Sequence, residues 1–424
     1  MKIIIKKLLL AILFLCICFL NAYSQDNSVR YKTTDGKYTF YFGDLHSHTV
    51  YSGDRGKNQA ARKSLPEGDM SIYNPDDGDL PMHAFAEARR LGLDFFAVTD
   101  HSNVLTERSA PDQKPQNWWY ENGFTETHWQ ELLRDAKAAT ESGKFVAIYG
   151  YEYSNNDKNN EPGHINVFNT QKWESALPEV NNITWLLEEA LPPQKANEIN
   201  IGSKMMAQFN HAGIRQYDNY LELVNPRSVA MNGKPGKNYN QFVRLMEWNR
   251  NRLPVWQKVL NSGWKVAPVS NSDVHGVYGI KNNLRFGAGV LATELSLEAI
   301  MDALYERRTF GTWSPGVCLE FRINGAIQGT EFEKRPVGDT LDVEVFAKNS
   351  NDKPVFKVEI MGGNYAPDNP ENSPHQLLST IEFGAGLDRA KTTVPNTYDF
   401  YYALLYMQVE QTAACSAPIW MDNL

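Results

Sequence analysis

The chain alternates short apolar runs with amphipathic segments from about residue 37 to residue 310, and this alternation constrains the fold more than any other feature. The apolar runs are rich in β-branched and aromatic residues, which is typical of strands buried on both faces. The segments 81–91, 127–142 and 295–308 have the apolar periodicity of helices. Repeated alternation of this kind predicts a parallel α/β domain, and a closed barrel is the favoured version. The predicted strands are 39–45, 95–99, 145–151, 164–168, 205–210, 244–248 and 265–269.

The pattern changes after residue 313. Short alternating segments follow, and turn residues such as Asn324-Gly325 separate them. A chain of 424 residues is also too long for one ordinary core, so two domains are expected. We therefore predict an α/β barrel over 38–313 and a C-terminal β-sandwich domain over 314–424. The predicted strands of the sandwich are 318–323, 340–348, 356–362, 379–383 and 398–410.

The N-terminus has the pattern of a secretory signal peptide. A lysine-rich start precedes the apolar run 8–20, and small residues lead to Ser24, after which we expect cleavage. Residues 1–24 would then be removed, 25–37 would be a linker, and the protein would be periplasmic or extracellular. Bulky Leu15 and Ile17 precede the two early cysteines and argue against a lipoprotein. The run is short for a membrane span and no later run reaches that length, so no transmembrane anchor is expected after cleavage.

Charge and cysteine content limit the partners of the chain. The net charge of −8 becomes more negative once the N-terminal lysines are removed, which argues against broad nucleic-acid binding. Cys318 and Cys415 follow the signal peptide. In an exported protein they could form a disulfide or remain two buried thiols, and the sequence favours neither. The oligomeric state is also left open.

Histidines and acidic residues lie where the predicted strands begin or end. The C-terminal ends of parallel barrel strands meet at one rim, so these side chains are expected to converge. His46 and His48 are two residues apart on a strand and therefore point to the same face, as do Asp273 and His275. Nitrogen and oxygen ligands without thiolates suit zinc, manganese or iron. The predicted ligands from residues alone are His46, His48, His101, Glu152, His164, His211, Asp273 and His275.

Five short motifs carry a resemblance to a known family. They are Asp44-Leu45-His46-Ser47-His48-Thr49, Thr99-Asp100-His101, Gly163-His164-Ile165-Asn166, Asn210-His211 and Ser272-Asp273-Val274-His275. In order and spacing, over about residues 38–310, they resemble the PHP (polymerase and histidinol phosphatase) family of metal-dependent phosphoesterases. With its C-terminal β domain, the whole chain looks most similar to the secreted CehA/McbA-like metallohydrolases.

The resemblance implies a distorted seven-fold β/α barrel with two or three divalent metal ions on its rim. It assigns His46, His48, Glu152 and Asp273 to the first metal, and Glu152, His164 and His211 to the second, with Glu152 bridging. It assigns Asp54, His101 and His275 to the third. Clustered metals lower the pKa of a bridging water and supply hydroxide, which suits the hydrolysis of a small-molecule phosphate ester. The predicted catalytic residues are Glu152, Asp273, His101 and His275.

Further residues have predicted supporting roles. Arg215, Arg250 and Arg285 lie near strand ends and could bind a phosphate group. Asp100 and Glu247 are expected to orient metal ligands. Two alternatives stay open: a carboxylester or carbamate hydrolase with the same metal centre, and a non-catalytic protein that binds through its β domain. We interpret the remaining histidines, His83, His128 and His375, as surface or packing residues.

Overall fold

The structure is a computed structural model. It describes residues 30–52, 79–102, 124–155, 163–176, 185–191, 205–211, 241–283, 287–314, 316–350, 354–384, 386–409 and 411–421. The predicted signal peptide, residues 1–24, lies outside them. Within these ranges, no helix is both long enough and apolar enough to cross a membrane.

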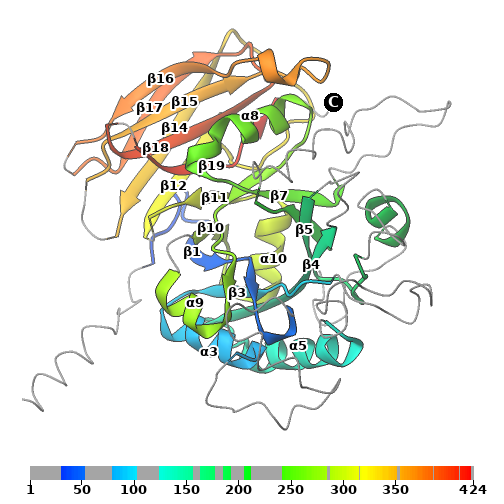
Figure 1. Cartoon of the computed structure of the whole chain (residues 1–424). Coiled ribbons are helices and arrows are strands. Elements are labelled where there is room, and N and C mark those ends of the chain that lie inside the picture. The colour runs from blue at the N-terminus through cyan, green and yellow to red at the C-terminus, as the bar shows by residue number, and fades with distance from the viewer. Residues whose placement is uncertain are drawn as a thin grey trace, which may run out of the picture.

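The N-terminal part of the chain forms a twisted sheet with helices packed against it (Figure 1). Every strand predicted before residue 313 is present. The strands, in sheet order, are β10 (Gly287–Ala292), β1 (Thr39–Asp44), β3 (Phe95–Val98), β4 (Val146–Asn155), β5 (Gly163–Phe168), β6 (Met206–Phe209), β7 (Val243–Glu247) and β8 (Ala267–Val269). The short strands β2 (Ser47–His48) and β9 (Val274–His275) pair separately.

The three helices predicted from periodicity are confirmed. They are α3 (Pro81–Arg90), α5 (Glu126–Ala139) and α10 (Leu297–Tyr305). Thr125 caps α5 by accepting a hydrogen bond from the backbone N–H of His128, and the helix buries Trp129 against Tyr149 and Tyr151. The other helical segments are η1 (Val50–Ser52), η4 (Leu186–Ala190), η9 (Arg250–Arg252), α8 (Leu253–Asn261), α9 (Gly276–Asn283) and η10 (Pro370–Asn372).

The prediction that all these strands run parallel was wrong. Strand β5 is antiparallel to both β4 and β6, and β10 is antiparallel to β1. Only residues 156–162 connect β4 to β5, and a parallel crossover needs roughly a dozen residues or more. The reversal places the first residues of β5 beside the C-terminal ends of β4 and β6. His164 therefore reaches the same edge as the other predicted ligands.

The structure does not show a closed barrel. Among the described strands, β8 forms a ladder only with β7. Its other side approaches β11 (Thr309–Thr312), where the Thr309 hydroxyl donates to the carbonyl of Pro268 at 3.1 Å. The described fold is a mixed α/β sheet, and the seven-fold barrel stays a prediction.

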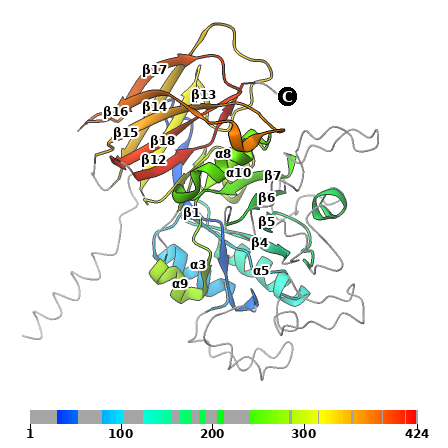
Figure 2. The same ribbon diagram turned by 45° about the horizontal axis from the view of Figure 1, so that its top comes forward.

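The C-terminal residues form two layers of β-sheet (Figure 2). One layer contains β13 (Ala326–Ile327), β12 (Val317–Ile323), β14 (Thr340–Asn349) and β17 (Arg389–Pro395). The other contains β16 (Gln376–Glu382), β15 (Lys357–Gly363), β18 (Phe400–Gln408) and β19 (Gln411–Ser416), with β20 (Ile419–Trp420) paired to β18. Because β19 pairs with β11 and β11 with β10, this second layer continues into the α/β sheet.

The hydrophobic core also crosses the predicted domain boundary. Phe40 of β1 packs against Phe310 of β11 and Phe346 of β14, with ring centroids 6.0 and 5.6 Å apart. The described end of the predicted linker is attached as well, because the backbone N–H of Thr34 donates to Glu320 at 2.8 Å. The C-terminal sheets are therefore part of the same packed structure as the α/β sheet.

Cys318 and Cys415 are both buried and both free thiols. Cys318 lies on β12 and Cys415 on β19, so they belong to different layers. Burial raises the pKa of each thiol. Of the two alternatives left open by the sequence, the structure has the buried thiols.

Candidate metal centre

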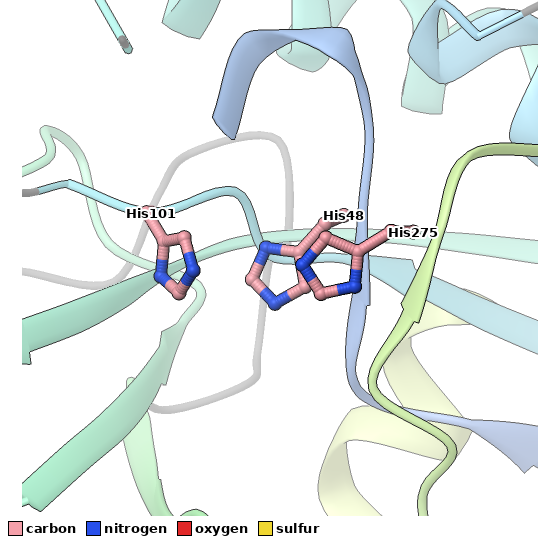
Figure 3. Close-up of side chains that lie close together, drawn as sticks. All are labelled: His48, His101 and His275. Carbon is pink, nitrogen blue, oxygen red and sulfur yellow. The ribbon is translucent and has the colours of Figure 1, made fainter. Parts of the chain in front are cut away.

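Two of the predicted ligand pairs are held side by side by a short parallel ladder. Strand β2 pairs with β9 so that Ser47 lies opposite Val274 and His48 opposite His275. The rings of His48 and His275 stack with centroids 4.4 Å apart, and His101 faces them from the end of β3 (Figure 3). Pairing of the His46-Ser47-His48 and Asp273-Val274-His275 motifs thus brings together predicted ligands that are more than 220 residues apart in the sequence.

Glu152 lies at the middle of the cluster and is fully buried. Its Oε1 atom is 3.2 Å from His46 Nε2 and 3.1 Å from His164 Nδ1. Its Oε2 atom is 2.6 Å from His101 Nδ1. The two oxygens of one carboxylate therefore face histidines from three different parts of the sheet, as a carboxylate shared between two metal ions would have to.

Asp273 contacts histidines of the cluster through both of its carboxylate oxygens. Its Oδ1 atom is 3.0 Å from His48 Nε2, and its Oδ2 atom is 3.2 Å from His211 Nε2. Asp273 and His211 both have left-handed backbone conformations, with φ of 48° and 47°. Such conformations cost non-glycine residues of order 1–3 kcal/mol and are common at functional sites. The surrounding fold therefore stabilises a strained arrangement at two adjacent ligands.

The spacing of the ligand atoms fits a metal ion. Atoms bound tetrahedrally at about 2.0–2.2 Å from a zinc ion are roughly 3.3–3.6 Å from one another. The ring nitrogens of His46 and His48 are 3.0 Å apart, and they lie 3.5 and 3.0 Å from Asp273 Oδ1. One of these separations lies in that range, and the other two are about 0.3 Å shorter. Glu152 Oε2 and Asp273 Oδ1 are buried and accept no well-aligned hydrogen bond from the described residues. Nitrogen and carboxylate donors with unsatisfied acceptor oxygens fit divalent zinc, manganese or iron.

Four groups of three residues could each hold an ion, with ligand atoms all within 4.8 Å of one another. The groups are His46–His48–Asp273, His46–Glu152–His211, His101–Glu152–His164 and His48–His101–His275. The first contains three of the four residues that the resemblance assigns to the first metal, and lacks Glu152. Four residues each belong to two of these groups, namely His46, His48, His101 and Glu152, so the allocation of ligands to three separate ions stays a prediction.

Residues behind the ligands fix the orientation of the imidazole rings. Glu247 Oε1 lies 2.6 Å from His46 Nδ1, which leaves the Nε2 atom to face the cluster. Ser52 Oγ lies 2.6 Å from His48 Nδ1 and donates to Asp100 Oδ1 at 2.9 Å. These contacts have the form expected of Glu247 and Asp100 as orienting residues.

Two serines that contact the imidazole rings were not predicted from the sequence. One is Ser52, and the other is Ser154, whose Oγ lies 2.6 Å from His101 Nδ1. Ser154 is two residues after Glu152 on β4 and so points to the same face. That spacing was a usable signal for Ser154. No comparable signal singles out Ser52 among the serines of the chain.

The cluster shifts the pKa values of its members in opposite directions. Burial raises the pKa of Glu152, but the charges of His46, His164 and His101 hold it well below its usual range. Burial, together with the charges of His101 and His275, lowers the pKa of His48 to about 4. His48 is thus neutral and Glu152 ionised at neutral pH, and these are the protonation states that bind metals.

The eight ligands predicted from residues alone are all described, and all eight lie in this cluster. Asp54 lies outside the described residues, as do Arg215 and Arg285. Arg250 is directed toward the C-terminal sheets, where its guanidinium lies 4.5 Å from the centre of the Trp313 ring. His375 packs against Tyr402 with ring centroids 5.6 Å apart, in agreement with a packing role.

Comparisons with known proteins leave the family unassigned. No protein-family model matches the chain, and no curated protein matches it. A solved two-domain protein from Bacteroides vulgatus, described as containing a predicted PHP-like metal-dependent phosphoesterase, is 14% identical over 93% of this chain and 99% of that chain, with a TM-score of 0.42. T. fusca AA10A and an LPMO from Kitasatospora papulosa are 9% and 10% identical, each over 22% of this chain and 53% of the other, with TM-scores of 0.16. These similarities are too low to assign an activity.

Proposed function

We propose that the chain is an exported metal-dependent phosphoesterase of the PHP type, which hydrolyses a small-molecule phosphate ester with two or three zinc, manganese or iron ions. The observation that carries the proposal is the burial of Glu152 among six histidines and Asp273, with ligand atoms at metal-binding separations. A structural role alone does not require a fully buried carboxylate surrounded by this many imidazoles, or the two buried acceptor oxygens of Glu152 and Asp273 that lack an aligned donor among the described residues. The motif resemblance supports the same reading.

The most exposed ligands indicate where a substrate would enter. His46, His48 and Glu152 are buried, whereas the side chain of Asp273 is 38% exposed. His211 and His275 are also only partly buried. The open side of the cluster is therefore the side formed by Asp273, His211 and His275, and we assign the substrate to it.

Phosphate ester hydrolysis requires charge stabilisation and a water nucleophile more than a protein nucleophile. When bound, the metal ions would lower the pKa of a water molecule and neutralise charge on the phosphoryl oxygens. Glu152 and Asp273 would hold the ions with their ionised carboxylates. His275 lies on the open side with its Nδ1 atom 3.1 Å from the carbonyl oxygen of Asp273. If the third ion is not bound, we assign His275, together with His101, to proton transfer to the leaving group.

The proposal can be tested on the purified full chain by elemental analysis and a panel of chromogenic esters. We expect two or three metal ions per chain and turnover of a phosphomonoester or phosphodiester. Glu152→Gln should lose metal and at least about a hundredfold in activity, because it removes the shared anionic ligand. Glu320→Gln is the matched control, because Glu320 is equally buried but lies on β12.

Three outcomes separate the alternatives. Turnover of carboxylesters alone, with the same loss in Glu152→Gln, would replace the phosphoesterase with the carboxylester or carbamate hydrolase. Less than one metal per chain after reconstitution with zinc, manganese and iron would overturn the metal centre. Metal binding without turnover of any ester would favour the non-catalytic binding protein.

A further inference from the structure

A cavity lies where the α/β sheet meets the C-terminal sheets. Its volume is 370 Å³, which falls in the range of small-molecule sites. Its walls come from η9, from the segment after β11, and from the ends of β18 and β19 that face each other. None of the eight metal-site residues lines it. Residues from both parts of the chain therefore form this cavity.

One guanidinium group is held in a fixed orientation in the wall of this cavity. The Arg250 group stacks on the Trp313 ring at 4.5 Å. With its amide turned so that both ends are satisfied, the Gln411 side chain accepts hydrogen bonds from both terminal nitrogens of Arg250 at 2.9 Å each. Orientation before binding lowers the entropic cost of binding a ligand. An arginine carries five N–H donors, so donors remain for a ligand after these contacts.

The charge in the cavity is unbalanced. Arg250 forms no ion pair with any described residue, and the described residues that line the cavity include no acidic side chain. This is notable in a chain with a net charge of −8. The remaining walls include the apolar side chains of Trp313 and Met407 and the amide of Gln408. A partly buried guanidinium without a counter-ion, beside apolar walls, favours an anionic ligand that has an apolar body.

The cavity is also close to the metal centre along the chain. Arg250 comes three residues after Glu247, so the Cα atoms of these two residues can be at most about 11 Å apart. Glu247 in turn contacts His46 of the metal centre. We infer that the cavity is an anion-binding subsite, which takes a carboxylate or phosphate group carried on a small apolar molecule. The anion has two sources. It can be a remote group of the substrate, which rests on the proposed function, or a separate small anion.

The binding test uses benzoate as the probe and benzamide as its neutral isostere, titrated calorimetrically into the purified full chain. We expect one benzoate site per chain and at least tenfold weaker binding of benzamide. Arg250→Gln should weaken benzoate binding at least tenfold. Arg389→Gln is the matched control, because Arg389 is an exposed arginine that lies over an aromatic ring, Phe346, on another sheet.

A second variant tests the subsite in case the Arg250→Gln protein does not fold. Gln408→Glu places a negative charge at an exposed position of the cavity wall and should weaken benzoate binding without disturbing the core. Equal benzoate affinity in the original chain, Arg250→Gln and Gln408→Glu would overturn the subsite, as would the absence of a saturable site. None of these results depends on catalysis, so failure of the subsite and failure of the proposed function are distinguishable.

Kinetics separates the two sources of the anion. If the subsite holds part of the substrate, benzoate should raise the KM of an ester substrate, and Arg250→Gln should remove this competition. If it holds a separate anion, benzoate should bind without changing KM. Both results support the subsite, and each assigns its occupant.

Discussion

Removing the carboxylate of Glu247 tests the metal centre most directly. This carboxylate contacts two predicted ligands, His46 and His211, but is not itself a predicted ligand. Its Oε1 atom lies 2.6 Å from His46 Nδ1, and its Oε2 atom accepts from the backbone N–H of His211 at 2.7 Å. Burial raises the pKa of Glu247, but the charge of His46 and these hydrogen bonds hold it below its usual value. Glu247 is therefore an anion that fixes one ligand ring and one strained ligand backbone.

Glu247→Gln keeps the size of the side chain but cannot satisfy both partners. An amide has one acceptor oxygen, so its NH₂ group must face either the His46 Nδ1–H or the His211 N–H. One charge-assisted hydrogen bond is lost, which costs about 1.5–3 kcal/mol. We therefore expect metal affinity to fall by about 10–100-fold, in the range measured for outer-shell ligands elsewhere.

The assay is competition for zinc between the protein and a chromogenic chelator, with the dissociation constant fitted at fixed pH. Glu359→Gln is the control, because Glu359 is a partly buried glutamate on β15 of the C-terminal sheet. A dissociation constant within about threefold of the original in Glu247→Gln would refute the orienting role, since even the smallest expected loss is about tenfold.

Three further predictions concern stability. Burial lowers the pKa of His375 from 6.5 to about 4, so between these pH values the unfolded chain binds a proton that the folded chain does not. The free energy of unfolding should therefore fall by about 3 kcal/mol as the pH drops from 6.5 to 4. Urea unfolding at pH 7 and pH 4.5 should show a smaller difference in His375→Gln than in the original chain. Glu331→Gln leaves the buried cations of Lys265 and Arg307 without their shared anion and should destabilise the fold by about 3–5 kcal/mol in the same assay; a loss below about 1 kcal/mol would contradict the pairing. Phe40→Ala should cost about 3–5 kcal/mol and lower the melting temperature of both parts together, because Phe40 joins their cores; separate calorimetric transitions with only one shifted would show independent domains.

The sequence by itself determined the elements and the chemistry of the centre. Apolar periodicity located the strands and helices, because a helix or strand face depends on spacings of a few residues. The eight predicted ligands could be named because each stands near the beginning or the end of such a run. The donor atoms of those side chains predicted zinc, manganese or iron, and the type of metal stays a prediction.

Only the tertiary structure decided how these elements meet. The reversal of β5 brought His164 to the edge of the sheet, and the β2–β9 ladder set His48 beside His275. The roles of Ser52 and Ser154 depended on which ring nitrogen each one faces. Strand pairing and ring orientation are set by contacts between residues far apart in the chain, so they cannot be predicted from a local sequence pattern.

The same reason explains the domain organisation. The change of pattern after residue 313 correctly indicated β-structure, but it did not show how the predicted β-sandwich domain meets the α/β part. The pairing of β19 with β11 joined the two parts through one sheet, and it also formed the cavity around Arg250. Sequence assigned that arginine to a phosphate from its place near a strand end. Its actual neighbours, Trp313 and Gln411, come from the two sides of a junction that exists only in the folded chain.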